Sequence, residues 1–324
     1  MHLTQDLDAG LQDYLFSQKW ISDNEKVLDY QVAGQGNMNF VARVVTSKGS
    51  FILKQSRPYV EKYQQVAAPI ERIEVERDFY KAIYPNALLS KMSPKVLGFD
   101  VSNHILALED LGKAADYTNL YSGKRQIEKE EIDSLIDYLL ELHQIKVIGF
   151  PSNDKMKALN HEHIFRYPFM EENGFDLDSV QLGLQNLAMA YKTDYLLKEA
   201  LEKLGNRYLA TGEKLLHGDY YPASWLNSEL GLKVIDPEFG FKGDAEFDLG
   251  VMLAHFKMAE VSDDLVNYTK ETYLAKSNLD IKLLNQYSSV EILRRLIGLA
   301  QLPLTLSLEK KENLCQEAAE TLKK

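Results

Sequence analysis

Two acidic segments of this 324-residue chain carry side chains that could do chemistry together. The segment "LLHGDYYPASWL", residues 215–226, ends its apolar run shortly before Asp219. A second short apolar run, "LKVI", is followed by Asp236 and Glu238, and Pro237 between them cannot be a regular ladder partner. Two short apolar runs this close in sequence predict a β-hairpin, which would bring the three carboxylates into one cleft.

Three carboxylates in one cleft repel one another, so the cluster predicts a cation among them. Magnesium favours hard oxygen ligands and commonly shares them with the phosphates of a substrate. We therefore expect Asp236 and Glu238 to hold Mg²⁺ on a nucleotide, and Asp219 to accept the proton of an attacking hydroxyl group. The competing interpretation is that all three are solvated turn acids, because Asp-Pro commonly opens a turn.

The N-terminal third offers groups that could hold phosphates. In "VAGQGNMNFVARVV", residues 32–45, the backbone of Gly34 and Gly36 could approach phosphate oxygens, although an ordinary hairpin turn is the alternative. Lys54 lies inside the apolar strand "SFILKQ", where an unpaired ammonium group would be costly. We expect Glu76 to pair with it, because Glu76 lies near the apolar face of the predicted helix "PIERIEVERDFYKAIY". A lysine fixed in this way can hold nucleotide phosphates.

The elements that must position these groups change along the chain. β-Rich runs dominate from about residue 27 to 56, one helix covers residues 69–84, and two more strands follow it. From residue 128 onward the pattern is mostly helical. The sequence therefore predicts an α+β fold of two lobes, with residues 109–113 as the candidate joint.

Composition argues against several classes of protein. Apolar residues make up 45% and charged residues 26% of the chain, which is typical of a soluble globular protein. The net charge of -11 argues against non-specific nucleic-acid binding, which requires a basic face. The single cysteine, Cys315, lies in a helical pattern where we expect it to pack, and no apolar run suggests a membrane span. We expect a cytoplasmic protein.

The order of these motifs resembles that of the protein-kinase-like small-molecule kinases, which include aminoglycoside phosphotransferases and choline kinases. Within that group the chain is most similar to methylthioribose kinases. "GQGNMNFV" resembles the nucleotide-covering loop of that family, and "LKQSRPYV" resembles its strand-lysine segment. "LHGDYYPAS" and "VIDPEFGFKGDAEFDLG" resemble its catalytic and metal-binding segments, and "EILRRLIGLA" carries a similar pair of arginines.

The resemblance implies a protein-kinase-like fold with a small β-rich N-terminal lobe (1–108), a hinge (109–113) and a larger, mostly helical C-terminal lobe (114–324). It implies ATP and Mg²⁺ as cofactors. Together with the expectations above, it implies that the nucleotide is bound by Gly34, Gly36, Asn37, Asn39, Lys54, Glu76, Glu109 and Leu111. The implied metal ligands are Asp236, Glu238 and Ser224, and the implied catalytic base is Asp219.

The acceptor side is predicted from fewer residues. The resemblance implies that Arg294 and Arg295 help to bind a sugar, but adjacent arginines on a helix point in different directions, so we expect only one to reach the cleft. Ordinary surface or ion-paired arginines are the alternative. Tyr220 and Tyr221 depart from the family motif, and we expect them to form a wall for the acceptor unless they pack the loop against the lobe. Asp248 opens a predicted helix, where we expect it to cap the N-terminus; the resemblance suggests a bond to the catalytic loop.

These observations favour an enzyme that phosphorylates a hydroxyl group of a small, sugar-like metabolite. The alternatives are an aminoglycoside- or choline-type kinase and a nucleotide-binding pseudokinase without turnover. We expect the partner to be a small-molecule hydroxyl acceptor rather than nucleic acid or a membrane, and the protein to be a monomer or a homodimer. Methylthioribose kinases are typically longer than this chain, so we expect material to be missing from the helical lobe.

Overall fold

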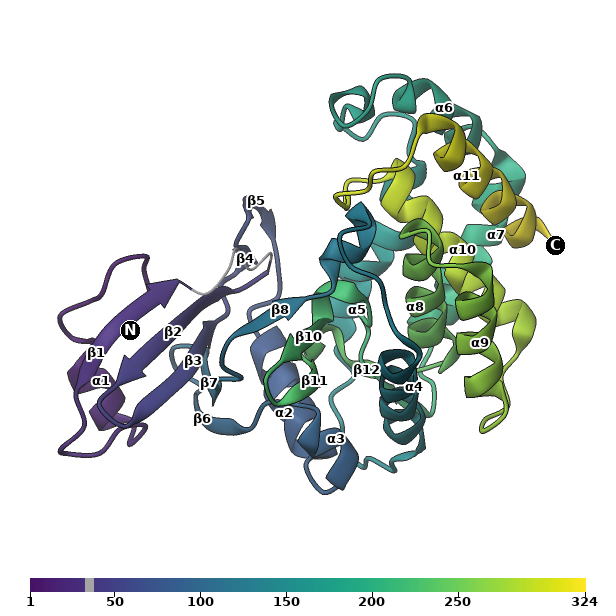
Figure 1. The fold of residues 1–324 in the computed structure, drawn as a ribbon. Helices are drawn as coiled ribbons and strands as arrows, with labels where there is room; N and C mark the ends of the chain where they lie inside the picture. The colour runs from purple at the N-terminus through teal and green to yellow at the C-terminus, as the bar shows by residue number, and fades with distance from the viewer. Residues whose placement is uncertain (33–37) are drawn as a thin grey trace.

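The computed structural model describes residues 1–32 and 38–324. Its N-terminal part is an antiparallel sheet of five strands in the order β1-β2-β3-β7-β6 (Figure 1). The strands are rich in Val, Ile, Phe and Leu, which pack well on a pleated, half-buried surface. Their bounds are β1 (Val27–Val32), β2 (Phe40–Thr46), β3 (Gly49–Gln55), β6 (Val96–Asp100) and β7 (Ile105–Glu109).

Side chains alternate between the two faces of this sheet. Ala42 and Val44 of β2 are fully buried against Leu11 of helix α1, whereas Val41 and Arg43 line the pocket described below. One face of the sheet is therefore closed by the N-terminal segment, and the other is left for the site. The remaining elements of this part are α1 (Leu11–Ser17), β4 (Tyr59–Val60), β5 (Tyr63–Ala67), α2 (Arg72–Ile83) and α3 (Ala87–Lys91).

The larger C-terminal part is mostly helical (Figure 1). Every residue of α8 from Phe247 to Phe256 is buried, because this helix is predominantly apolar around its circumference. Cys315 of α11 is also buried, as expected for a helix-packing residue. The helices are α4 (Lys129–Gln144), α5 (Asp154–His161), α6 (Leu184–Lys192), α7 (Tyr195–Leu209), α8 (Glu246–Met258), α9 (Asp263–Leu274), α10 (Ile281–Ile297) and α11 (Leu308–Lys323).

The sheet and the helices share a continuous apolar core. Ile73 and Phe79, on the buried face of α2, belong to one cluster with Leu106 of β7, Leu135 of α4 and Met252 of α8. The predicted α+β fold, with a small β-rich part and a larger helical part, is confirmed. The lobe boundaries at residues 108 and 113 remain a prediction.

Short strands connect the two parts and carry the acidic segments. β8 pairs with β10, β10 forms a hairpin with β11, and β9 pairs with β12. Asp219 follows β9 and Asp236 follows β11. The hairpin predicted between these two apolar runs is wrong, because β9 pairs with β12 and β11 pairs with β10, so the β10–β11 hairpin lies between the two acidic segments. These strands are β8 (Ala114–Asp116), β9 (Lys214–Leu216), β10 (Trp225–Ser228), β11 (Gly231–Val234) and β12 (Phe241–Gly243).

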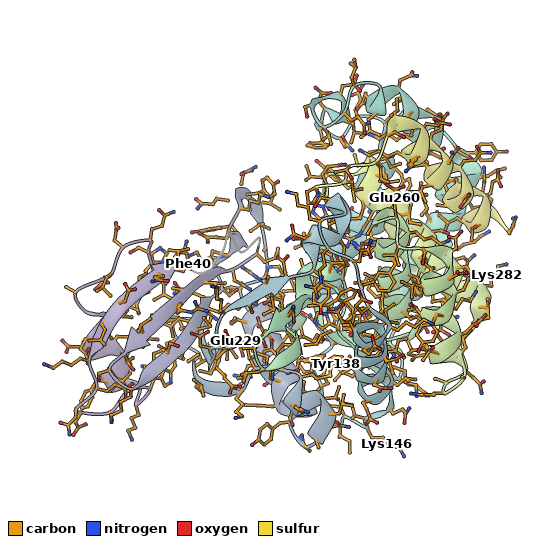
Figure 2. The ribbon with its side chains drawn as sticks, in the orientation of Figure 1. Phe40, Tyr138, Lys146, Glu229, Glu260 and Lys282 are labelled. Atoms are coloured by element: carbon orange, nitrogen blue, oxygen red, sulfur yellow. The ribbon has the colours of Figure 1, made fainter. Side chains whose placement is uncertain are left out.

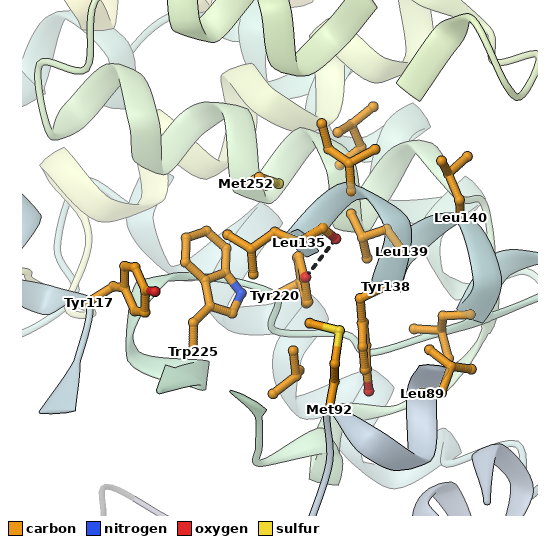
Figure 3. Close-up of a cluster of buried hydrophobic side chains, with 14 of the residues drawn as sticks. Leu89, Met92, Tyr117, Leu135, Tyr138, Leu139, Leu140, Tyr220, Trp225 and Met252 are labelled. Carbon is orange, nitrogen blue, oxygen red and sulfur yellow. Dashed lines mark hydrogen bonds between the residues drawn. The ribbon is translucent and has the colours of Figure 1, made fainter. Parts of the chain in front are cut away.

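An aromatic cluster packs where β10 approaches α4 (Figure 3). The ring of Tyr220 stacks on that of Tyr138, with centroids 5.9 Å apart and an interplanar angle of 11°. Trp225 lies 5.3 Å from Tyr220 and 6.1 Å from Tyr117, measured between ring centroids. Aromatic pairs of this kind contribute about 0.5–1.5 kcal/mol each beyond their buried area, so the cluster holds the segment after Asp219 firmly in place.

Side chains fill the interior of both parts, from Phe40 on β2 to Tyr138 on α4 (Figure 2). Charged residues such as Lys146, Glu229 and Lys282 are exposed on the outside (Figure 2). Among the helices of the described ranges, none combines the length and apolar character needed to cross a membrane.

Candidate active site

Asp219 is carried on a tight turn between β9 and the aromatic cluster. Gly218 adopts a φ of 81°, and a Cβ atom added to it would lie 2.2 Å from the backbone oxygen of Phe239. Only glycine therefore fits this position. His217 is fully buried; its Nε2 atom lies 2.9 Å from the backbone oxygen of Ile235, and its Nδ1 atom accepts a bond from the backbone of Asp219. His217 thus supports the turn.

Asp248 holds the same turn rather than capping a helix. The expected N-cap is wrong, because α8 begins at Glu246 after Ala245, which places Asp248 inside the first turn. Its carboxylate accepts hydrogen bonds from the backbone N–H groups of His217 (2.7 Å) and Gly218 (3.0 Å). The bond to the catalytic loop that the resemblance suggested is therefore present.

Two arginines of α10 face the Asp219 carboxylate. The Nη2 atoms of Arg294 and Arg295 lie 3.7 and 3.5 Å from Asp219 Oδ1. The expectation that only one would reach the cleft is wrong, because both long side chains bend toward Asp219 and contact it, and neither lines the pocket itself. Burial raises the pKa of Asp219 to about 6, although Arg295 and Arg294 oppose this shift. Asp219 therefore has the properties of a base that is ionised near neutral pH.

Glu291, which no motif in the sequence singled out, holds both arginines. Its Oε1 atom accepts from Arg295 Nε at 2.8 Å and lies 2.9 Å from His255 Nε2, while its Oε2 atom contacts Arg294 Nε. Burial alone would raise the pKa of Glu291, but the two arginines outweigh burial and hold it well below its usual range. The i, i+3 and i, i+4 spacing of Glu291 to the arginines was visible in the sequence and could have predicted these pairs.

The two tyrosines after Asp219 have different environments. Tyr220 is fully buried, and its hydroxyl donates to the backbone oxygen of Leu135 at 2.9 Å, so the prediction that it faces the acceptor is wrong. Successive side chains of an extended segment point to opposite sides, which turns Tyr220 into the core. Tyr221 instead lines the pocket, with the Arg295 guanidinium carbon 4.8 Å from the centre of its ring.

Lys54 joins the sheet to the second acidic segment. Its Nζ atom lies 2.7 Å from Glu76 Oε2, so the expected contact between strand lysine and helix glutamate is present, and 2.6 Å from Asp236 Oδ1. Burial lowers the pKa of Lys54, but Asp236 and Glu76 outweigh it and raise the pKa above its ordinary value. Lys54 is therefore a charged group, held between a buried carboxylate and a half-exposed one.

Glu238 is held by side chains of the N-terminal part. Asn39 Nδ2 donates to Glu238 Oε2 at 2.8 Å, and Arg72 Nε lies 3.1 Å from the same oxygen. Arg72 Nε also donates to Asn39 Oδ1. The side-chain amide of Asn39 therefore bonds to both Glu238 and Arg72. Ser224 lies nearby in the loop that carries Asp219, where its hydroxyl donates to the backbone oxygen of Asp219 at 2.8 Å.

One pocket of about 710 Å³ collects most of the predicted site residues. Those that line it are Asn39, Lys54, Glu109, Leu111, Asp219, Tyr221, Ser224, Asp236 and Glu238. Glu76, Arg294 and Arg295 are buried behind the lining and act on it through Lys54 and Asp219. Gly34, Gly36 and Asn37 lie outside the described residues.

The sequence profile of the phosphotransferase enzyme family matches residues 29–279, which is most of the chain and includes both acidic segments. The chain belongs to the phosphotransferase enzyme family.

Relatives within the phosphotransferase enzyme family agree with the resemblance seen in the sequence. The chain is 28% identical to the methylthioribose kinase of Klebsiella pneumoniae (strain 342) over 251 residues, which cover 72% of this chain and 61% of that protein. The chain thus covers less than two thirds of the length of the curated relatives that it matches.

Solved structures of other phosphotransferases share the fold. A spectinomycin phosphotransferase in complex with ADP and spectinomycin superposes with a TM-score of 0.56 at 16% sequence identity, covering 96% of each chain. A choline kinase from Streptococcus pneumoniae superposes with a TM-score of 0.53 at 17% identity, covering 96% of this chain and 97% of that one. Both likenesses support the fold alone.

The acidic residues of this phosphotransferase-family site fit a magnesium ion shared with a nucleotide. Within the described ranges, no three His, Cys, Asp or Glu side chains come together closely enough to hold a metal by themselves. Magnesium, however, usually takes only one or two carboxylates and completes its shell with phosphates and water. Asp236 Oδ2 and Glu238 Oε1 receive no hydrogen bond from the described residues and are the oxygens that such an ion could use.

Proposed function

We propose that this protein transfers the γ-phosphoryl group of ATP, with Mg²⁺, to a hydroxyl group of a small, sugar-like metabolite. The observation that supports this most strongly is the shared pocket lined by Lys54, Asp219 and Asp236, in which Lys54 contacts Asp236 and Asp219 faces two arginines. The relatives named methylthioribose kinase support a sugar of that kind as the acceptor.

Each group has a defined task in this reaction. Asp219 accepts the proton as the acceptor oxygen bonds to the γ-phosphorus, and the bond between that phosphorus and ADP breaks with its electrons on ADP. Lys54 holds the nucleotide phosphates, and Glu76 keeps its ammonium group in place. Mg²⁺, held by Asp236 and Glu238, would neutralise phosphate charge. Most of the rate enhancement comes from positioning and charge stabilisation rather than from covalent chemistry.

The acceptor side favours a neutral or anionic acceptor over a cationic one. Arg294 and Arg295 pair with Asp219 as well as with Glu291, so the Asp219 carboxylate is already compensated and attracts a cationic acceptor less strongly. Quaternary ammonium groups are commonly recognised by open aromatic faces. Among the aromatic residues that line the pocket, Tyr221 already has the guanidinium of Arg295 near its ring. This arrangement supports a sugar acceptor rather than choline or an aminoglycoside.

The test is a coupled ADP-release assay with ATP and Mg²⁺ over a panel of acceptors. The panel contains methylthioribose, other pentoses and hexoses, choline, ethanolamine and several aminoglycosides, with the Asp219→Asn variant as control. We expect turnover on methylthioribose or a close analogue that is lost in the control. Turnover confined to amines would contradict the proposed acceptor class, and ATP binding with no turnover on any member would favour a pseudokinase.

A further inference from the structure

Arg72, the first residue of α2, is an unusual buried charge. It is 0% exposed, although arginine is almost never fully buried unless its charge is paired. Its Nε atom is 3.1 Å from Glu238 Oε2 and donates to Asn39 Oδ1 at 2.9 Å. Its remaining N–H groups donate to backbone oxygens of Met38 (2.6 Å), Arg57 (2.7 Å), Pro69 (2.8 Å) and Tyr59 (3.3 Å).

Arg72, Asn39 and Glu238 form a closed set of contacts. Asn39 donates to Glu238 Oε2 at 2.8 Å and accepts from Arg72, which itself pairs with the same oxygen. Both contacts to Glu238 use its Oε2 atom. Oε1 receives no hydrogen bond from the described residues, and Glu238 lines the pocket. The set therefore fixes one oxygen of the carboxylate and leaves the other for a ligand in the pocket.

The charge of Arg72 serves Glu238 rather than the backbone. Neutral donors would be enough for the four carbonyl oxygens, and burying a guanidinium group is costly unless a carboxylate pairs with it. Glu238 is the carboxylate that pairs with Arg72, and it comes from the C-terminal part of the chain, 166 residues further along. Met38 and Asn39 belong to the segment "GQGNMNFV", which is predicted to cover the nucleotide, so Arg72 also ties Glu238 to that segment.

We propose that Arg72 is a positioning residue for the divalent cation, which orients Glu238 and couples cation binding to the segment that follows residues 33–37. The proposal rests on the proposed function, because it takes Glu238 as a ligand of the nucleotide-bound cation. Residues that orient metal ligands commonly contribute 10- to 100-fold to metal affinity, and Arg72 occupies such a place.

The test measures Mn²⁺ binding by electron paramagnetic resonance in the presence of saturating ADP. We expect Arg72→Met to weaken Mn²⁺ binding by about 10- to 100-fold, while ADP affinity without a metal stays close to that of the wild type. Arg72→Lys keeps the charge but not the planar fork, so its loss should be smaller. The matched control is Arg77→Met on the same helix, since Arg77 pairs with Asp78 and lies over Phe99, away from Glu238.

A second variant, Asn39→Ala, keeps the proposal testable if Arg72→Met does not fold. This change removes one donor to Glu238 and leaves the backbone contacts of Arg72 intact, so we expect a several-fold loss of Mn²⁺ affinity with a normal thermal melt. Wild-type Mn²⁺ affinity in Asn39→Ala and in every folded Arg72 variant would overturn the proposal. A wild-type protein that binds no Mn²⁺ with ADP would instead contradict the proposed function itself.

Discussion

The pocket is bounded by two largely buried clusters, each containing charges of both signs, and the two clusters are built in different ways. The nucleotide-side cluster, Lys54, Glu76, Asp236, Glu238 and Arg72, joins segments remote in the chain; Lys54 and Asp236 are 182 residues apart. The acceptor-side cluster, Asp219, Glu291, Arg294, Arg295 and His255, takes three of its members from the single helix α10. The first cluster therefore depends on how the two parts of the fold meet, whereas the second is largely preformed on a helix.

The nucleotide-side cluster should be the more sensitive to loss of one charge. We expect Lys54→Met to lower the free energy of unfolding by about 3–5 kcal/mol, because Glu76 is left buried without its partner. Urea denaturation measures this loss. The double variant Lys54→Met/Glu76→Gln removes the orphaned charge and should recover much of the stability. Equal stability of wild type and Lys54→Met would remove the contrast between the clusters.

The acceptor-side cluster should tolerate the corresponding change better. We expect Glu291→Gln to cost about 1–3 kcal/mol, since Arg294 and Arg295 lose a charged acceptor but retain Asp219. Thermal and urea unfolding give this value, with Glu317→Gln on the exposed face of α11 as the control. A loss larger than that of Lys54→Met would reverse the order of the two clusters.

Activity should depend on pH through the acceptor-side cluster. The pKa of Asp219 is raised to about 6, so the carboxylate is mostly protonated at pH 5 and mostly ionised at pH 7. A base must be ionised to accept a proton, so kcat/KM should fall roughly tenfold from pH 7 to pH 5. Arg295 opposes the raised pKa of Asp219, and Arg295→Gln should therefore move the midpoint to higher pH. If the midpoint does not move, a group other than Asp219 controls the pH dependence of kcat/KM.

Ser224 gives the smallest expected effect. Its hydroxyl donates to the backbone oxygen of Asp219, and Ser224→Ala should cost about 0.5–1.5 kcal/mol of stability, the usual value of one hydrogen bond. Mn²⁺ affinity with ADP, measured on the same variant, tests whether Ser224 is also a metal ligand. Unchanged Mn²⁺ affinity would mean that Ser224 stabilises the turn that carries Asp219 and is not a metal ligand.

The fold and the Lys54–Glu76 pair were predictable from local patterns. The strand residues around Lys54 and the helical spacing that selected Glu76 are both short-range signals, and each leads to the observed contact. Arg72 was not predictable in the same way, because its partner Glu238 is distant in sequence and only the tertiary fold brings them together. The sequence also could not show that Tyr220 enters the core while Tyr221 lines the pocket.

On the acceptor side the misreadings had local causes. The direction of Arg294 and Arg295 was inferred from helix geometry alone, whereas long arginine side chains bend and Glu291 draws both to the same place. Asp248 was assigned to the helix end because the exact start of a helix is the least certain part of a sequence pattern. In both cases the sequence identified residues that lie at the site, and the packing of their side chains determined which groups they contact.

We expect the two clusters to do separate jobs, with nucleotide binding on one side of the pocket and proton acceptance on the other. The most direct test measures ADP affinity with Mg²⁺ and turnover on the same Asp219→Asn protein. The account predicts a loss of turnover of about 10²- to 10⁴-fold with unchanged ADP affinity, and weakened ADP affinity in Lys54→Met/Glu76→Gln. Retained turnover in Asp219→Asn, or an equal loss of ADP affinity in both variants, would contradict it.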